Sequence, residues 1–134
     1  MAIQNISRRP DYSDLDLDFI PHPTTKDVLI KTGEDAINRS VRNLILTNFY
    51  DRPFRPYIGS NAQKLLFENA NAITANLVKD AILEVIRNYE PRVEVNNLDV
   101  FFDFDNNGYS VTLAYIIINR SQPVTINLFL ERIR

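Results

Sequence analysis

The sequence predicts an α+β fold in which helical segments precede an antiparallel β-meander. Residues 32–90 space their apolar side chains as helices do, whereas residues 93–134 alternate apolar and polar side chains as strands do. The stretch NYEPRVEV, Asn88–Val95, contains the change from one pattern to the other. At 134 residues the chain suits a single domain, with the meander packed on the longest helix.

Residues 1–31 are expected to form an extended arm. The segment YSDLDLDF alternates acidic and apolar residues with the period of a strand, and the Pro21-His22-Pro23 bend disfavours helix. Two interpretations stay open. The arm is either a short edge strand folded onto its own domain, or a segment that leaves the core and adds a strand to a neighbouring subunit.

Three helices are expected in the helical part. The first follows Thr32, whose hydroxyl can cap it, and ends before the segment DRPFRPYIGS. The two prolines of that segment exclude regular helix and stiffen the chain. Ser60 and Gln63 are spaced as a capping box and predict a short second helix.

The third helix is the longest, and Asn71 or Thr74 caps it. Pro91 ends it, because a proline inside a helix costs about 3 kcal/mol. Its apolar side chains are expected to pack against the sheet. One face carries Ile73, Leu77, Ala81, Val85 and Tyr89, with Val78, Ile82 and Ile86 beside them.

Three strands are expected after this helix, the first with Leu98 and Phe102 on one face. Asn107-Gly108 predicts a hairpin with a type I′ turn, in which both residues have positive φ. The second strand covers residues 111–119, and Ser121-Gln122-Pro123 makes the next turn. The third, with Val124, Ile126, Leu128 and Leu130 on one face, is expected at the sheet edge with unpaired backbone groups.

Composition argues against several function classes. A net charge of −2 gives no reason to expect a nucleic-acid partner, and no segment has the pattern of a signal peptide or membrane helix. The absence of cysteine and the single histidine, His22, disfavour a zinc site and a catalytic triad. With 3 glycines no phosphate-binding loop can be assembled. We therefore expect no cofactor, no metal and no membrane partner.

Residues 103–108 match the opening of a calcium-binding loop, D-x-D-x-N-G. The twelfth position of such a loop must supply a bidentate carboxylate, and here it is Ala114. Strands rather than helices also flank the segment. We interpret it as a hairpin tip and expect no metal site.

The enzymatic alternative is a lysozyme-like glycoside hydrolase that uses Glu90. Such enzymes need two carboxyl groups roughly 5–10 Å apart, one of them with a raised pKa. Glu94 or an aspartate of the first strand would be the second acid. Arg92, two residues after Glu90, would instead keep that carboxylate ionised. We expect no enzymatic activity and no catalytic residue.

Three arginines favour a binding role. Arg52, Arg55 and Arg92 all lie in proline-stiffened segments close to helix ends. They are either scattered surface ion pairs, worth about 0–1 kcal/mol each, or parts of rigid charged elements that a partner protein recognises.

Several segments, in their order along the chain, carry a resemblance to one known family: YSDLDLDF, the Pro21-His22-Pro23 bend, SVRNLILTNFYDRPFRPYIGS, KLLFEN and YEPRVEV. The chain resembles the small baseplate wedge protein, or sheath initiator, of contractile-tailed phages. That family has counterparts in type VI secretion baseplates and has also carried a lysozyme-like label. One departure is Tyr57-Ile58 before Gly59, where the family pattern has an acid and an aromatic residue.

The resemblance implies a structural role in the virion, at the inner baseplate, with assembly in the host cytoplasm. It implies that Glu90, Pro91 and Arg92 grip a helical bundle of the larger wedge subunits. It also implies that the C-terminal sheet edge templates the first ring of the tail sheath protein. Tail-tube or hub-proximal proteins are further expected partners.

Overall fold

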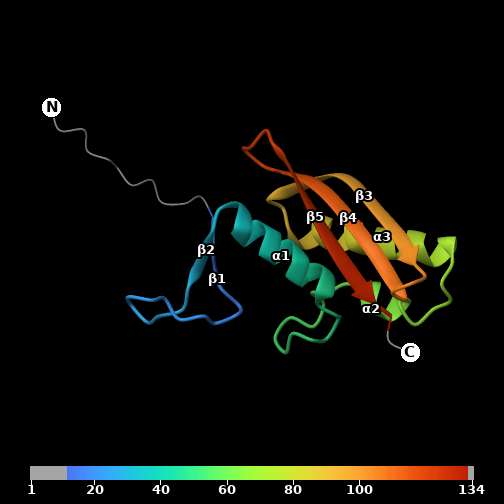
Figure 1. Ribbon diagram of the computed structural model, residues 1–134, viewed down its shortest axis with the longest axis horizontal. Coiled ribbons are helices and arrows are strands. Elements are labelled where there is room, and N and C mark those ends of the chain that lie inside the picture. The colour runs from blue at the N-terminus through green and yellow to red at the C-terminus, as the bar shows by residue number, and fades with distance from the viewer. Residues whose placement is uncertain (1–11, 133–134) are drawn as a thin grey trace. The chain divides into compact units, whose positions relative to one another are not determined.

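The computed structural model describes residues 12–132. The chain divides into two compact units, with the boundary between Arg39 and Ser40 inside the first helix. Helices before a three-stranded antiparallel sheet confirm the α+β prediction (Figure 1). The elements are β1 (Ser13–Leu15), β2 (Ile30–Thr32), α1 (Glu34–Leu46), α2 (Ala62–Leu65), α3 (Ala72–Tyr89), β3 (Val93–Asp103), β4 (Gly108–Ile117) and β5 (Pro123–Glu131).

The first unit contains a strand pair made by the arm itself. β1 pairs antiparallel with β2, so this part of the arm folds back within its own unit. Asp16 is buried there, 3.7 Å from both the Lys31 amine and the Arg39 guanidinium. His22 accepts backbone N–H groups through Nδ1 and is a loop residue. The part of the arm prediction that falls on residues 1–11 lies outside the described residues.

The core of the second unit lies between the sheet and α3, which packs on one face of it (Figure 1). β4 is the central strand, and every second side chain along it is buried. Burying each large side chain contributes roughly 1.5–3 kcal/mol before entropy is counted. The buried side chains of β4 are Tyr109, Val111, Leu113, Tyr115 and Ile117, and those of α3 include Val78, Ile82, Val85 and Ile86.

The buried face of α3 differs from the predicted one at its N-terminal end. Ile73, predicted to lead the apolar face, is 71% exposed, and Leu77 is exposed as well. The helix is apolar around more of its surface than the sheet covers, so the stripe of Val78, Ile82 and Ile86 is buried, whereas the predicted face is buried only at Val85. The predicted cap is confirmed: the Asn71 Oδ1 atom accepts the Thr74 backbone N–H at 2.8 Å.

The capping box predicted for α2 is wrong. Ser60 Oγ accepts the Ala62 N–H at 2.9 Å, but the Gln63 side chain does not reach back to it. The Gln63 amide instead accepts from Asn48 Nδ2 at 2.6 Å and donates to the Leu46 carbonyl at 3.2 Å. Gln63 therefore fastens the preceding loop rather than the helix start.

The hairpin at Asn107-Gly108 is confirmed, but its turn type is not I′. Asp103 pairs with Gly108, which leaves a four-residue connection in which only Asn107 has positive φ, at 49°. Gly108 is required for another reason. A Cβ atom there would overlap the Phe129 ring and would lie 2.6 Å from the Leu130 carbonyl oxygen.

The hairpin tip is stabilised by one carboxylate. Asp103 accepts the backbone N–H groups of Asp105 and Asn106 and the Asn106 side-chain amide. The bonds from Asn106, side chain first and then backbone, lower the pKa of the Asp103 carboxyl. Within residues 12–132 no group of three or more His, Cys, Asp or Glu side chains could hold a metal ion. The segment is a hairpin tip, as predicted.

Candidate partner-binding sites

The Glu90-Pro91-Arg92 junction joins α3 to β3. Tyr89 is the last helical residue, and the Glu90 N–H still donates to the Ile86 carbonyl at 2.9 Å. Pro91 then ends the helix, as predicted, because its ring cannot continue the hydrogen-bond ladder. The Glu90 side chain points into the protein and is 2% exposed.

Arg92 and Glu90 form a bidentate ion pair. Arg92 Nε donates to Glu90 Oε1 at 2.6 Å, and Arg92 Nη2 donates to Glu90 Oε2 at 2.9 Å. Ser40 Oγ, from α1, donates to the same Oε2 atom at 2.5 Å. The two parallel bonds fix the plane of the guanidinium against the carboxylate.

The carboxyl of Glu90 is held in its charged form. Burial on its own would raise the pKa of Glu90, but hydrogen bonds from Arg92 and Ser40, with the Arg92 charge, outweigh burial and lower it. This confirms the prediction that Arg92 keeps the acid ionised. A general acid must be protonated at its working pH, so this carboxyl is unsuited to that role.

Only part of the Glu90-Pro91-Arg92 junction is accessible to a partner. Pro91 is exposed and the Arg92 side chain is 27% exposed, whereas Glu90 is inaccessible. Glu90 can therefore act on a partner only by orienting Arg92. Ser40 was missed by the sequence reasoning. A signal for it existed: it is a polar residue inside the apolar stripe of α1, three residues after Ile37 and four before Leu44.

The loop between α1 and α2 carries Arg52 and Arg55, both exposed. It is closed at its base by the Ser60 N–H, which donates to the Thr47 carbonyl at 2.8 Å. Nearer the tip, the Tyr50 N–H donates to the Pro56 carbonyl at 2.9 Å. Neither arginine forms a salt bridge with any residue from 12 to 132, so intramolecular pairing does not explain them.

The loop and the junction are directly connected. The Tyr89 hydroxyl donates to the Tyr57 carbonyl oxygen at 2.9 Å, which ties the loop to the last residue of α3. Glu90 follows Tyr89 immediately. The structure thus joins the two segments that the sequence analysis singled out, although they lie more than 30 residues apart.

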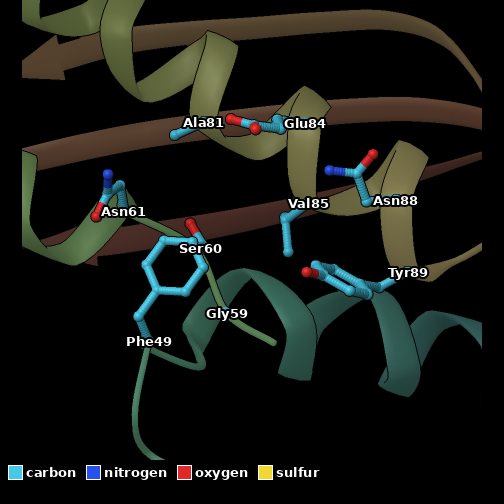
Figure 2. Close-up of a pocket in the computed structure, with 9 residues that line it drawn as sticks. All are labelled: Phe49, Gly59, Ser60, Asn61, Ala81, Glu84, Val85, Asn88 and Tyr89. Carbon is cyan, nitrogen blue, oxygen red and sulfur yellow. The ribbon is translucent and has the colours of Figure 1, made fainter. Parts of the chain in front are cut away.

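A cavity of about 250 Å³ lies between this loop and α3. Figure 2 shows Phe49 and Tyr89 on two sides of it with Val85 between them, and Glu84 and Asn88 above. Glu84 supplies the one carboxylate in the lining, and Glu90 is not part of the lining. A glycoside hydrolase site needs two carboxyl groups across the substrate, so this cavity does not have the composition of one.

β5 lies at the edge of the sheet, as predicted. Among the described residues it pairs with β4 alone, which leaves the backbone groups on its other side without a strand partner. The four predicted side chains, Val124, Ile126, Leu128 and Leu130, face the core, and the last two are buried. A partner at this edge would meet mainly the backbone of β5 and the outward side chains between these four.

Known proteins are similar to this chain over most of its length. The model of one protein family, described as baseplate wedge protein gp25, matches residues 31–122. The chain belongs to this family. It is also 31% identical over 113 residues to baseplate wedge protein gp25 of Enterobacteria phage T4, covering 84% of this chain and 85% of that protein. The chain is accordingly a structural baseplate component, which confirms the resemblance read from its sequence.

Solved structures share the fold of this baseplate wedge protein. A chain in the baseplate of the anti-feeding prophage has a TM-score of 0.64 at 19% identity, covering 92% of this chain and 87% of that one. A chain of the postcontracted pyocin R2 baseplate has a TM-score of 0.55 at 15% identity, covering 88% and 98%. A crystal structure from Geobacter sulfurreducens, named for a tail lysozyme, has a TM-score of 0.64 at 20% identity, covering 77% and 96%.

The name lysozyme is that of the Geobacter protein. At 20% identity, the similarity of that protein to this chain shows a shared fold and does not extend to activity. The arrangement around Glu90 in the present chain, buried, paired and ionised, gives it no chemical support. No helix in the described part of the chain is both long and apolar enough to cross a membrane.

Proposed function

We propose that this baseplate wedge protein is an adaptor of a contractile tail, located in the virion after assembly in the host cytoplasm. In this proposal it docks on the helical bundle of the larger wedge subunits through the Glu90-Pro91-Arg92 junction. Arg52 and Arg55 of the adjoining loop contribute to the same docking. The edge of β5 then recruits the first ring of the tail sheath protein, and tail-tube or hub-proximal proteins are further neighbours.

The observation that carries the docking proposal is the ion pair between Arg92 and Glu90. A buried carboxylate that holds a partly exposed guanidinium in two places fixes the direction of the remaining guanidinium surface. Pre-orienting a contact residue lowers the ordering cost of binding, so such an arginine is well suited to recognise a partner's polar groups.

The unpaired side of β5 supports the sheath proposal. A sheet edge offers a row of backbone N–H and C=O groups to which an extended segment of another chain can add as a new strand. Residues 124–130 would make this contact through their backbone, because the side chains of Val124, Ile126, Leu128 and Leu130 face inward. The sheath protein is proposed as the partner because of the family resemblance, since an unpaired strand edge does not by itself select a particular protein.

The docking proposal is tested with the purified full-length chain and the wedge subunits of its own tail. Arg92→Lys keeps the charge but cannot reproduce two parallel bonds to Glu90, and it is expected to weaken co-elution with the bundle subunits. Arg42→Lys, at an exposed site on α1, is the matched control. Equal co-elution of both variants and wild type would refute docking through the junction.

The sheath proposal has its own test. Thr125→Pro removes a backbone N–H from β5 and is expected to reduce recruitment of sheath subunits if that N–H lies on the outer side. Along β5 the backbone N–H groups point alternately to β4 and to the outer side, so only one of two neighbouring residues has an outward N–H. Val124→Pro and Thr125→Pro are therefore made in parallel. One of the two should block recruitment without unfolding the chain. Normal sheath rings with both folded variants would exclude the β5 edge.

The enzymatic alternative is tested by incubating the folded chain with peptidoglycan. We expect no cleavage above the background of the Glu90→Gln variant. Cleavage by wild type that is lost in Glu90→Gln would overturn the non-enzymatic assignment.

A further inference from the structure

Phe54 is the most exposed large apolar side chain in the described part of the chain, at 97%. It lies at the tip of the loop between α1 and α2, two residues after Arg52 and one before Arg55. An isolated exposed leucine or phenylalanine on a flat surface needs no explanation. This phenylalanine is different, because the loop beneath it is built to hold it outward.

The loop is held by contacts that do not depend on a partner. The Asp51 N–H donates to the Asn48 carbonyl at 3.3 Å, and the Asp51 carboxylate accepts the Asn48 N–H at 2.8 Å. Tyr50 takes a left-handed conformation, with φ at 72°, that sends the chain into the tip. Pro53 and Pro56 flank the tip and reduce the freedom of its backbone. Phe54 is therefore presented in advance of binding.

The surroundings of Phe54 define the chemistry that would receive it. Tyr50 and Tyr57 are exposed in the same loop, and Arg52 and Arg55 carry its positive charge. Asp51, the one acid of the tip, has its carboxylate engaged with the Asn48 backbone. An aromatic centre bordered by guanidinium groups is the composition of an interface hot spot.

We propose that Phe54 is the central anchor of this docking loop, and that it inserts into an apolar pocket rimmed by carboxylates on a partner protein. The proposal rests on the proposed function, because it takes the partner to be another wedge subunit. Arg52 and Arg55 pair with the carboxylates of the rim, and the tyrosines exclude water around them. The net charge of −2 on the whole chain disfavours a nucleic acid as the occupant.

The test compares Phe54→Ala with Phe104→Ala in the full-length chain. Phe104 is a suitable control, because it is a phenylalanine at a loop tip that is 83% exposed. By titration calorimetry against the purified wedge subunits, Phe54→Ala is expected to weaken binding by at least about tenfold. Phe104→Ala should change it by less than about twofold. Phe54→Ala should unfold at the same denaturant concentration as wild type, and Phe104→Ala at a slightly lower one, because the Phe104 ring packs edge-on against Phe102.

A charge variant tests the rim. Arg52→Glu with Arg55→Glu is expected to weaken binding further and to reverse the contribution of these two positions to its salt dependence, since two attractive charges become repulsive and salt then screens a repulsion. An unchanged salt dependence would overturn the carboxylate rim. Equal binding by Phe54→Ala and wild type, with Arg92→Lys impaired, would overturn the anchor while leaving the docking function in place.

If the wild-type chain binds no wedge subunit, the proposed function fails and the anchor is decided separately. A photo-crosslinking benzoylphenylalanine is placed at position 54, and assembled baseplates are irradiated. Crosslinks to apolar residues flanked by Asp or Glu would support the anchor. Crosslinks to lipid, to nucleic acid or to a surface without carboxylates, or no crosslink at all, would overturn it.

Discussion

The hydroxyl of Tyr89 donates a hydrogen bond to the backbone carbonyl of Tyr57, 2.9 Å away. This bond fastens the loop that carries Arg52 and Arg55 to the residue immediately before Glu90. The two candidate docking segments are therefore joined by a direct hydrogen bond.

Removing this link should loosen the loop selectively. Tyr89→Phe deletes the donor and is expected to cost about 1 kcal/mol of unfolding free energy. Hydrogen exchange measures the local effect: the Tyr50 and Ser60 amides, which close the loop, should exchange faster than in wild type. Tyr50→Phe, at an exposed hydroxyl, is the control. Unchanged protection of both amides in Tyr89→Phe would show that the bond does not hold the loop.

The stability of the protein should depend on pH through Glu90. Its pKa is lowered in the folded state, so its ion pair contributes stability above the unfolded pKa of about 4.3 and loses it as pH falls through the folded value. Glu90→Gln should be less stable than wild type near pH 7, by about 2 kcal/mol, and the gap should close in acid.

Urea unfolding from pH 7 down to pH 3 measures this gap. Asp103 also has a lowered pKa and loses stability in the same direction, so the difference between variant and wild type is the informative quantity. A gap that stays constant over this range would mean that Glu90 does not titrate as described.

Arg92→Ala should destabilise the fold. Because Arg92 supplies two of the bonds to a buried carboxylate, its loss is expected to cost about 2–3 kcal/mol. Chemical unfolding of Arg92→Ala beside Ser40→Ala, which removes one bond and should cost about 1–2 kcal/mol, measures the difference. Wild-type stability in Arg92→Ala would contradict the pairing.

Gly108→Ala should disrupt the hairpin although Gly108 does not have positive φ. The new methyl group would overlap the Phe129 ring and the Leu130 carbonyl oxygen, at an expected cost of about 1–3 kcal/mol. Adding Phe129→Ala should recover only part of the loss, because the backbone oxygen stays in place. Full recovery in thermal unfolding of the double variant would show that the ring alone causes the clash.

Local signals predicted the elements of this fold well. Pro91 ends α3, Asn71 caps it, and Asn107-Gly108 marks the hairpin, because each of these effects acts within a few residues. The predictions that were wrong concern contacts between residues far apart in the sequence. The pattern of α3 contains two apolar stripes, and how much of each is buried depends on where the sheet lies. Gln63 is spaced for a capping box but finds better partners in Asn48 and Leu46.

The sequence predicted the individual residues of the candidate docking site, but not the hydrogen bonds that join them to distant parts of the chain. The influence of Arg92 on Glu90 followed from a separation of two residues. Ser40 lies 50 residues from Glu90, and no rule of local spacing links the two. The bond between Tyr89 and Tyr57 likewise depends on the path of a loop, which proline and glycine content describes only as stiff.

The inward orientation of the apolar side chains of β5 has an evolutionary consequence. A strand that joins this edge would be recognised mainly through its peptide groups, which every sequence possesses, with a smaller contribution from the outward side chains of β5. The incoming segment would need to keep an alternation of apolar and polar residues and little else. Partner genes could then diverge, or be exchanged between viruses, without losing the ability to assemble.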